Sequence, residues 1–108
     1  MGEKVERIAF TMRVKPGKEA EYRRRHAAVW PEMLRALKGA GCSKYSIYMK
    51  GRDLFAYMEL DDFHRFKRLI SDHADAQRWE AHMAPIMDQA IQAETGFHEV
   101  LPEVFHLD

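Results

Sequence analysis

The sequence predicts an α+β fold whose elements follow the order β-α-β-β-α-β. Three observations carry this prediction. Apolar and polar residues alternate near the N-terminus and again over residues 44–60, which is the period of a strand. Between them, apolar residues recur at three- and four-residue steps over about 18–38, which is typical of a helix. Similar helical spacing returns after residue 62.

The first strand is expected over residues 8–14, where every second side chain is apolar. A Pro-Gly pair at 16–17 ends it. The first helix is expected over about 18–38, and Gly39 and Gly41 stop it. One long helix therefore follows the first strand in this prediction.

A hairpin is expected next, with strands over 44–50 and 54–60 joined by a turn at 51–53. Asp61 and Asp62 are suited to cap the following helix, because an aspartate side chain accepts hydrogen bonds from free backbone N–H groups.

A further helix is expected from near Asp75 to about Ala90, and a last strand over about 99–107. Pro102 places that strand at an edge or a bulge, since proline cannot donate to the ladder. The complete order is that of a ferredoxin-like sandwich.

The length and the net charge of the chain limit the functions that it can have. With 108 residues the chain is expected to form a single domain, residues 1–108. Its 17 basic and 17 acidic residues cancel, which disfavours nucleic acid as a partner because nucleic-acid binding needs a basic face. No apolar run is long enough for a membrane, and the lone Cys42 fits a reducing compartment, so a cytoplasmic protein is expected.

The strand over 54–60 is apolar on both faces, with Phe55 and Tyr57 opposite the other four apolar residues. Helices on one side of a sheet cover only one of these faces. The second face is expected to meet a ligand, a second sheet or both. Packing two such sheets face to face gives a homodimeric α+β barrel, and a dimer is expected.

Chemistry-bearing side chains gather on the first helix, where Tyr22, His26 and Trp30 stand at i, i+4 and i+8. A phenol, an imidazole and an indole suit a sugar pocket, because they supply hydrogen bonds, a group that titrates near neutral pH and an aromatic plate. For Tyr22 and His26 taken alone, a partly buried helix face with one satisfied histidine is the more common explanation of this spacing. Pro31 is expected to kink this helix beside His26.

Elsewhere the sequence offers few sites. Tyr45 shares a strand face with Ile47 and Met49, and Tyr48 lies on the opposite face. One of these two tyrosines is expected to point toward the first helix. Trp79 is expected to be a core anchor. The remaining histidines show no metal-ligand spacing, and no glycine-rich phosphate loop is present, so neither a metal nor a cofactor is expected.

The sequence resembles the L-rhamnose mutarotase family. The strings that carry the resemblance are Glu21-Tyr22-Arg23-Arg24-Arg25-His26, Val29-Trp30-Pro31-Glu32, Tyr45-Ser46-Ile47-Tyr48, Gln77-Arg78-Trp79 and Glu103-Val104-Phe105-His106-Leu107. The resemblance implies a homodimeric isomerase that interconverts the α and β anomers of an aldose, most simply L-rhamnose, without a cofactor. It implies that His26 is the proton donor and that Tyr22, Tyr45 and Trp79 contact the sugar.

The chain departs from the family pattern at two places. Glu80 stands where the family often has a second tryptophan, and residues 87–96 replace an Asn-Pro-Asp type of loop. We count Glu80 and Trp30 with the substrate-binding residues, and a carboxylate at position 80 favours hydrogen bonds to hydroxyls.

Three questions stay open at the level of sequence. The group that partners His26 is a water, a tyrosine or a carboxylate such as Glu32. The sugar is L-rhamnose or another, such as L-fucose. The rival classes are a cofactor-free monooxygenase of the dimeric α+β barrel type and a binding module without catalysis.

Overall fold

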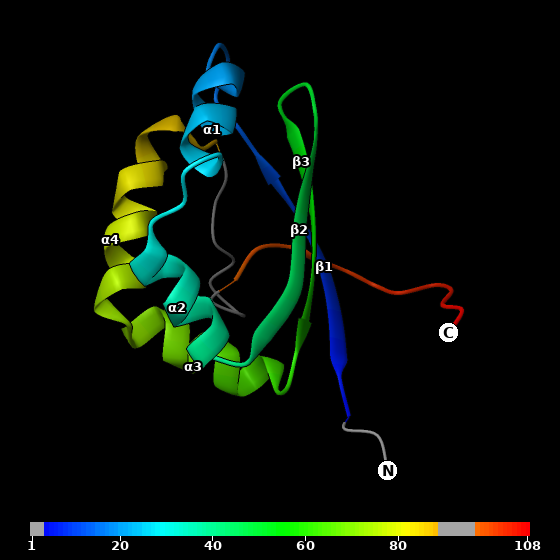
Figure 1. The fold of residues 1–108 in the computed structure, drawn as a ribbon. Coiled ribbons are helices and arrows are strands. Elements are labelled where there is room, and N and C mark those ends of the chain that lie inside the picture. The colour runs from blue at the N-terminus through cyan, green and yellow to red at the C-terminus, as the bar shows by residue number, and fades with distance from the viewer. Residues whose placement is uncertain (1–3, 89–96) are drawn as a thin grey trace.

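The computed structural model describes residues 4–88 and 97–108 of the chain. Within this part the strands form one antiparallel sheet with the order β2-β3-β1-β4. The helices lie together on one face of that sheet (Figure 1). The strands are β1 (Glu6–Arg13), β2 (Cys42–Lys50), β3 (Asp53–Leu60) and β4 (Val100–Leu101). The helices are α1 (Glu19–His26), α2 (Pro31–Gly39), α3 (Phe63–Asp72) and α4 (Ala74–Met83), followed by the 3-10 turn η1 (Ala84–Ile86). The predicted α+β class and the predicted order of strands and helical regions are confirmed.

The expected single helix over 18–38 is wrong, because the chain forms two helices with a break over residues 27–30. Pro31 is the first residue of α2, where its missing N–H costs nothing. Its ring also disfavours helical geometry in the preceding residue, and Trp30 is extended with φ −59° and ψ 137°. Proline therefore starts a new helix here instead of bending an existing one.

The second helical region is also divided. Asp62 caps α3, since its side chain accepts a hydrogen bond from the N–H of Arg65 at 3.0 Å, as the sequence predicts. His73 ends α3 and caps α4 by accepting from the N–H of Asp75 at 3.1 Å. The expected extension of the last helix to Ala90 is not found up to residue 88, because α4 ends at Met83; Ala90 itself lies outside the described residues.

The last strand is much shorter than the expected 99–107. It comprises Val100 and Leu101, which pair with Phe10 and Ala9 of β1. Pro102 follows directly and has no N–H for a longer ladder. Beyond it the chain extends away from the sheet (Figure 1).

The core lies between the sheet and the helices. On β3, Leu54, Ala56, Met58 and Leu60 are all buried, while Phe55 on the opposite face is 44% exposed. On β2, residues 45, 47 and 49 are half-buried toward the helices and the residues between them are exposed. The alternation read from the sequence is therefore confirmed for both strands of the hairpin.

Arg25 fastens α1 to α4. Its guanidinium donates to Glu21 of its own helix at 2.6 Å and to the carbonyl oxygen of His82 at 2.5 Å. Arg24 also donates to Glu21, and together the two arginines lower the pKa of that carboxyl to about 2. Arg24 is 74% exposed at its side chain, whereas Arg25 is 21% exposed, so only Arg25 contributes to packing.

None of the helices that the structure describes has the length and apolarity needed to cross a membrane.

Replacing Leu54 by alanine is expected to lower the free energy of unfolding by about 2–5 kcal/mol, because this fully buried side chain would leave a cavity between the sheet and the helices. Urea denaturation followed by circular dichroism measures the change. Leu69→Ala, at a side chain that is 37% exposed on α3, serves as the control and should cost less than about 1 kcal/mol. Equal costs would contradict the placement of Leu54 in the core.

Arg25→Ala is expected to cost about 1–3 kcal/mol, because it removes a charged donor from the His82 carbonyl and separates α1 from α4. Arg24→Ala removes the same side chain one residue earlier and should change stability by no more than about 0.5 kcal/mol. The comparison uses urea denaturation of both variants. A larger loss for Arg24→Ala than for Arg25→Ala would show that Arg25 does not fasten the helices.

Candidate active site

A cavity of about 380 Å³ lies between the helices and the inner face of the sheet. This volume is in the range of small-molecule sites. Its polar lining consists of His26 from α1, Tyr45 from β2, Trp79 and Glu80 from α4, and His98 from the residues before β4. The apolar lining consists of Phe10, Val29, Met33, Leu34, Leu37, Ile47, Met58, Phe66, Ile70 and Phe97. The cavity thus combines an apolar wall with a few groups able to exchange protons or hydrogen bonds.

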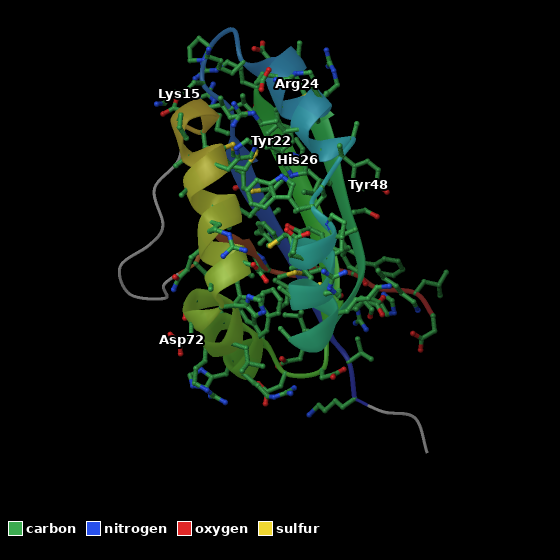
Figure 2. The ribbon with its side chains drawn as sticks, turned by 60° about the vertical axis from the view of Figure 1, so that its left-hand side comes forward. Lys15, Tyr22, Arg24, His26, Tyr48 and Asp72 are labelled. Carbon is green, nitrogen blue, oxygen red and sulfur yellow. The ribbon has the colours of Figure 1, made fainter. Side chains whose placement is uncertain are left out.

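His26 is held by its own helix. Its ring stacks on Tyr22, with ring centroids 4.1 Å apart and an angle of 20° between the planes. Nδ1 lies 3.4 Å from the carbonyl oxygen of Tyr22, so an N–H at Nδ1 donates a long hydrogen bond there and leaves Nε2 to exchange protons. Burial lowers the pKa of His26, opposed by that carbonyl. Figure 2 shows both side chains in the space between the helices and the sheet.

Trp79 joins the two sides of the break between α1 and α2. Its ring meets His26 edge-on at 5.5 Å and meets Trp30 edge-on at 5.0 Å. Trp79 is buried, whereas Trp30 is half-buried and also contacts His82 at 5.0 Å between ring centroids. Edge-to-face geometry is favourable for aromatic rings, so this contact fixes the position of His26 beside the cavity.

Tyr45 faces the same cavity from the sheet. Burial is the main reason that its pKa is raised, and the charges of Tyr22, Cys42 and Glu80 add to the shift. The pKa of Tyr22 is raised by burial and by the charge of Glu80. Both phenols therefore remain protonated at neutral pH and are able to donate hydrogen bonds to a ligand's oxygen atoms.

Glu80 brings a carboxylate to the cavity. The residue as a whole is exposed, yet it lines the cavity and its charge acts on both tyrosines. Loss of water around the carboxyl raises its pKa.

The residues expected from sequence are brought together in two layers. His26, Tyr45, Trp79 and Glu80 line the cavity itself. Tyr22 and Trp30 lie behind them, in contact with His26 and Trp79, and Tyr22 lines an adjoining hollow of about 410 Å³ that also includes His26. Glu32, weighed as a partner for His26, lines neither space. The residue of α4 that does line the cavity with His26 and carries a carboxyl is Glu80.

His98 is a lining residue that sequence reasoning missed. It stacks on Phe10 with ring centroids 5.2 Å apart, and burial lowers its pKa. Its Nδ1 is buried without a hydrogen-bond partner in the described part of the chain. No spacing in the sequence signals this residue, because it reaches the cavity through the pairing of β4 with β1. The unusual loop over 87–96 lies outside the described residues from position 89 onward.

Among the residues that the structure describes, no group of three or more His, Cys, Asp or Glu side chains is arranged to hold a metal ion.

Comparison with known proteins identifies the family of this chain. The family model for L-rhamnose mutarotase matches residues 7–107. An L-rhamnose mutarotase of Verminephrobacter eiseniae is 44% identical over 105 residues, which is 95% of this chain and 97% of that protein. One from Rhizobium meliloti is 44% identical over 103 residues, which is 87% of this chain and 98% of that protein.

A solved structure extends the likeness to three dimensions. The crystal structure of an L-rhamnose mutarotase from Formosa agariphila superposes with a TM-score of 0.77 at 29% identity, covering 95% of this chain and 99% of that one. The resemblance inferred from the Tyr22 to Glu32 region is confirmed across nearly the whole chain. With its fold, its cavity and its relatives in agreement, this chain belongs to the L-rhamnose mutarotase family.

Proposed function

We propose that this protein is an isomerase that interconverts the α and β anomers of a 6-deoxy sugar, most simply L-rhamnose, by acid–base opening and closing of the pyranose ring. The observation that carries the proposal is the meeting of an imidazole, a carboxyl and two protonated phenols at one cavity with an apolar wall. Membership of the L-rhamnose mutarotase family supports it. Neither a metal nor a cofactor enters the proposed reaction.

His26 is the proposed acid at the ring oxygen. It protonates that oxygen as the bond to C1 breaks, and it takes the proton back when the ring closes on the other face of C1. The imidazole is held in one orientation by three contacts: stacking on Tyr22, the edge-on ring of Trp79, and the hydrogen bond from Nδ1 to the carbonyl oxygen of Tyr22. Positioned acid–base groups contribute about 10²- to 10⁴-fold in rate, which suits a reaction that also proceeds in water.

The remaining site residues are proposed to bind the sugar. Tyr45 and Glu80 are suited to form hydrogen bonds with the sugar's hydroxyl groups, and Trp79 is suited to pack on a C–H face of the sugar. Tyr22 and Trp30 hold His26 and Trp79 in place by contacting their rings. The apolar wall fits the methyl group of a 6-deoxy sugar. L-fucose shares that methyl group, so it is the main alternative within the mutarotase class.

A second candidate function has one observation in its favour. Ten of the fifteen described residues that line the cavity are apolar, which suits a hydrophobic substrate for a cofactor-free monooxygenase. A binding module without catalysis would use the same cavity. The first of these predicts no effect on any sugar, and the second predicts sugar binding without faster anomer exchange.

We propose further that two copies associate through the outer face of the sheet into a dimeric α+β barrel. Phe55 and Tyr48 on that face are 44% and 66% exposed. Three apolar side chains of the C-terminal segment, Val104, Phe105 and Leu107, are at least 79% exposed. A second copy related by twofold symmetry would cover both surfaces at once.

The cellular setting proposed is the cytoplasm. The thiol of Cys42 is buried, and burial raises its pKa to about 11, so it is protonated and unreactive. The net charge of zero supports a small sugar as the partner and gives no general attraction for nucleic acid.

His26→Ala is expected to abolish catalysed anomer exchange while the protein stays folded, because it removes the proposed proton donor and leaves the core intact. Exchange NMR of the anomeric protons of L-rhamnose, L-fucose and D-glucose, with and without protein, measures the rate. The control is His64→Ala, at an exposed histidine of α3, which should match the wild type. Retained exchange in His26→Ala would remove His26 from the mechanism, and no acceleration by the wild type would reject the mutarotase proposal for these sugars.

Phe55→Lys is expected to convert the dimer to a monomer, because it places a charge at the centre of an apolar interface. Sedimentation velocity at micromolar concentration distinguishes the two states. Leu69→Lys, at an exposed leucine of α3 on the helical side, should remain dimeric. A wild-type monomer would contradict the proposed dimer, and a dimeric Phe55→Lys variant would move the interface elsewhere.

A further inference from the structure

Ring opening of a pyranose moves two protons, and His26 accounts for one of them. A proton reaches the ring oxygen while another leaves the anomeric hydroxyl, and both oxygens are bonded to C1. The second group must therefore reach the same small region as His26. Glu80 is the one carboxylate among the residues that line the cavity in the described part of the chain.

The fold places Glu80 at the same cavity as His26. It lies on α4 four residues after Ala76 and three before Met83, and both of these neighbours on the same helix face are buried. It directly follows Trp79, whose ring touches the His26 ring at 5.5 Å between centroids. The carboxyl has no hydrogen bond or ion pair with any other described residue, so it is not committed to a structural role.

The surroundings of Glu80 also distinguish it from the other acids. Glu21, for comparison, is neutralised by Arg24 and Arg25 on the surface of α1. Among the described residues no lysine or arginine lines the cavity, so a negative charge at Glu80 faces phenols and imidazoles. A carboxylate in such a position is a base available for a proton from substrate.

We propose that Glu80 is the second catalytic residue: its carboxylate removes the proton of the anomeric hydroxyl while the imidazolium of His26 protonates the ring oxygen. This inference rests on the proposed mutarotase function and adds the missing partner to it.

The step balances in protons and electrons. As the C1–O bond breaks, its electron pair goes to the ring oxygen, which takes the proton from Nε2 of His26. The electron pair of the anomeric O–H bond forms the carbonyl bond at C1, and Glu80 keeps the proton. After rotation about C1–C2, the freed hydroxyl attacks C1 and returns its proton to His26. Glu80 returns its proton to the former carbonyl oxygen. Both residues end as they began.

The position of each group suits its part. The ring oxygen stays in place through rotation, which fits an imidazole held between Tyr22 and Trp79. The anomeric oxygen moves from one face to the other, which fits a long side chain at the exposed rim of the cavity.

The active form holds one proton on the pair. Burial raises the pKa of Glu80 and lowers that of His26, so both shifts act against the imidazolium–carboxylate form, which is the reactive arrangement of the singly protonated pair. Activity should fall at low pH as the pair takes up a second proton and at high pH as it loses its only proton, giving a bell-shaped profile. The other titratable groups around the pair are Tyr22, Arg25, Tyr45, His82 and His98.

The test is Glu80→Gln, which keeps the shape and hydrogen bonding of the side chain and removes its basicity. We expect kcat for anomer exchange of L-rhamnose to fall about 100-fold or more, with KM changed little and the acidic limb of the pH profile lost. Glu80→Asp, which keeps the carboxyl one methylene shorter, should retain both limbs at a reduced kcat. Asp72→Asn removes a negative charge at the exposed end of α3, far from His26 in Figure 2, and should match the wild type.

The outcomes separate this inference from the proposed function. A wild type that accelerates exchange, together with a Glu80→Gln variant that keeps its kcat and its acidic limb, overturns the role of Glu80 and leaves the mutarotase standing. A raised KM with unchanged kcat would make Glu80 a binding residue only. A wild type without activity on L-rhamnose, L-fucose or D-glucose overturns both. Thermal unfolding of each variant, compared with that of the wild type, distinguishes a loss of activity from a loss of the folded structure.

Discussion

The site depends on one aromatic junction, the packing of Trp79 against His26 on one side and Trp30 on the other. Pro31 interrupts the first helical region, and without a third body the two short helices would be free to move relative to each other. The buried indole of α4 fills the gap between them. Arg25 adds a polar connection to the same helix through the carbonyl of His82. The imidazole is thus oriented both by Tyr22 of its own helix and by packing against Trp79 of α4.

Burial at this junction also shifts the pKa values of the titratable groups in the cavity. The same burial that fixes His26 lowers its pKa, and it raises the pKa values of Tyr22, Tyr45 and Glu80. All four shifts favour the uncharged form, because removal of water penalises charge. An acid and a base whose pKa values approach each other exchange a proton cheaply, which is what ring opening and closing of a sugar requires.

The two faces of the sheet are used differently. The inner face carries Tyr45 and the floor of the cavity, and the helices cover it. The outer face carries Phe55 and Tyr48, both exposed, and near it Arg7 of β1 pairs with Glu103 of the C-terminal segment at 2.8 Å. That segment leaves the sheet after Pro102 and carries its apolar side chains into solvent. In the proposed dimer, a second copy provides the surface on which these exposed side chains pack.

The sequence by itself determined the α+β class, the β-hairpin, the cap at Asp62 and the placement of Tyr22 and His26 on one helix face, because period, turn residues and local spacing are short-range properties. The string from Tyr22 to Glu32 also indicated the resemblance to the L-rhamnose mutarotase family. Only the tertiary structure decided that Pro31 begins a helix, that the last strand stops at Leu101, and that His98 lines the cavity with Glu80 while Glu32 does not. These outcomes depend on which elements pack against one another, and contacts between residues far apart in sequence leave no periodic trace in the chain.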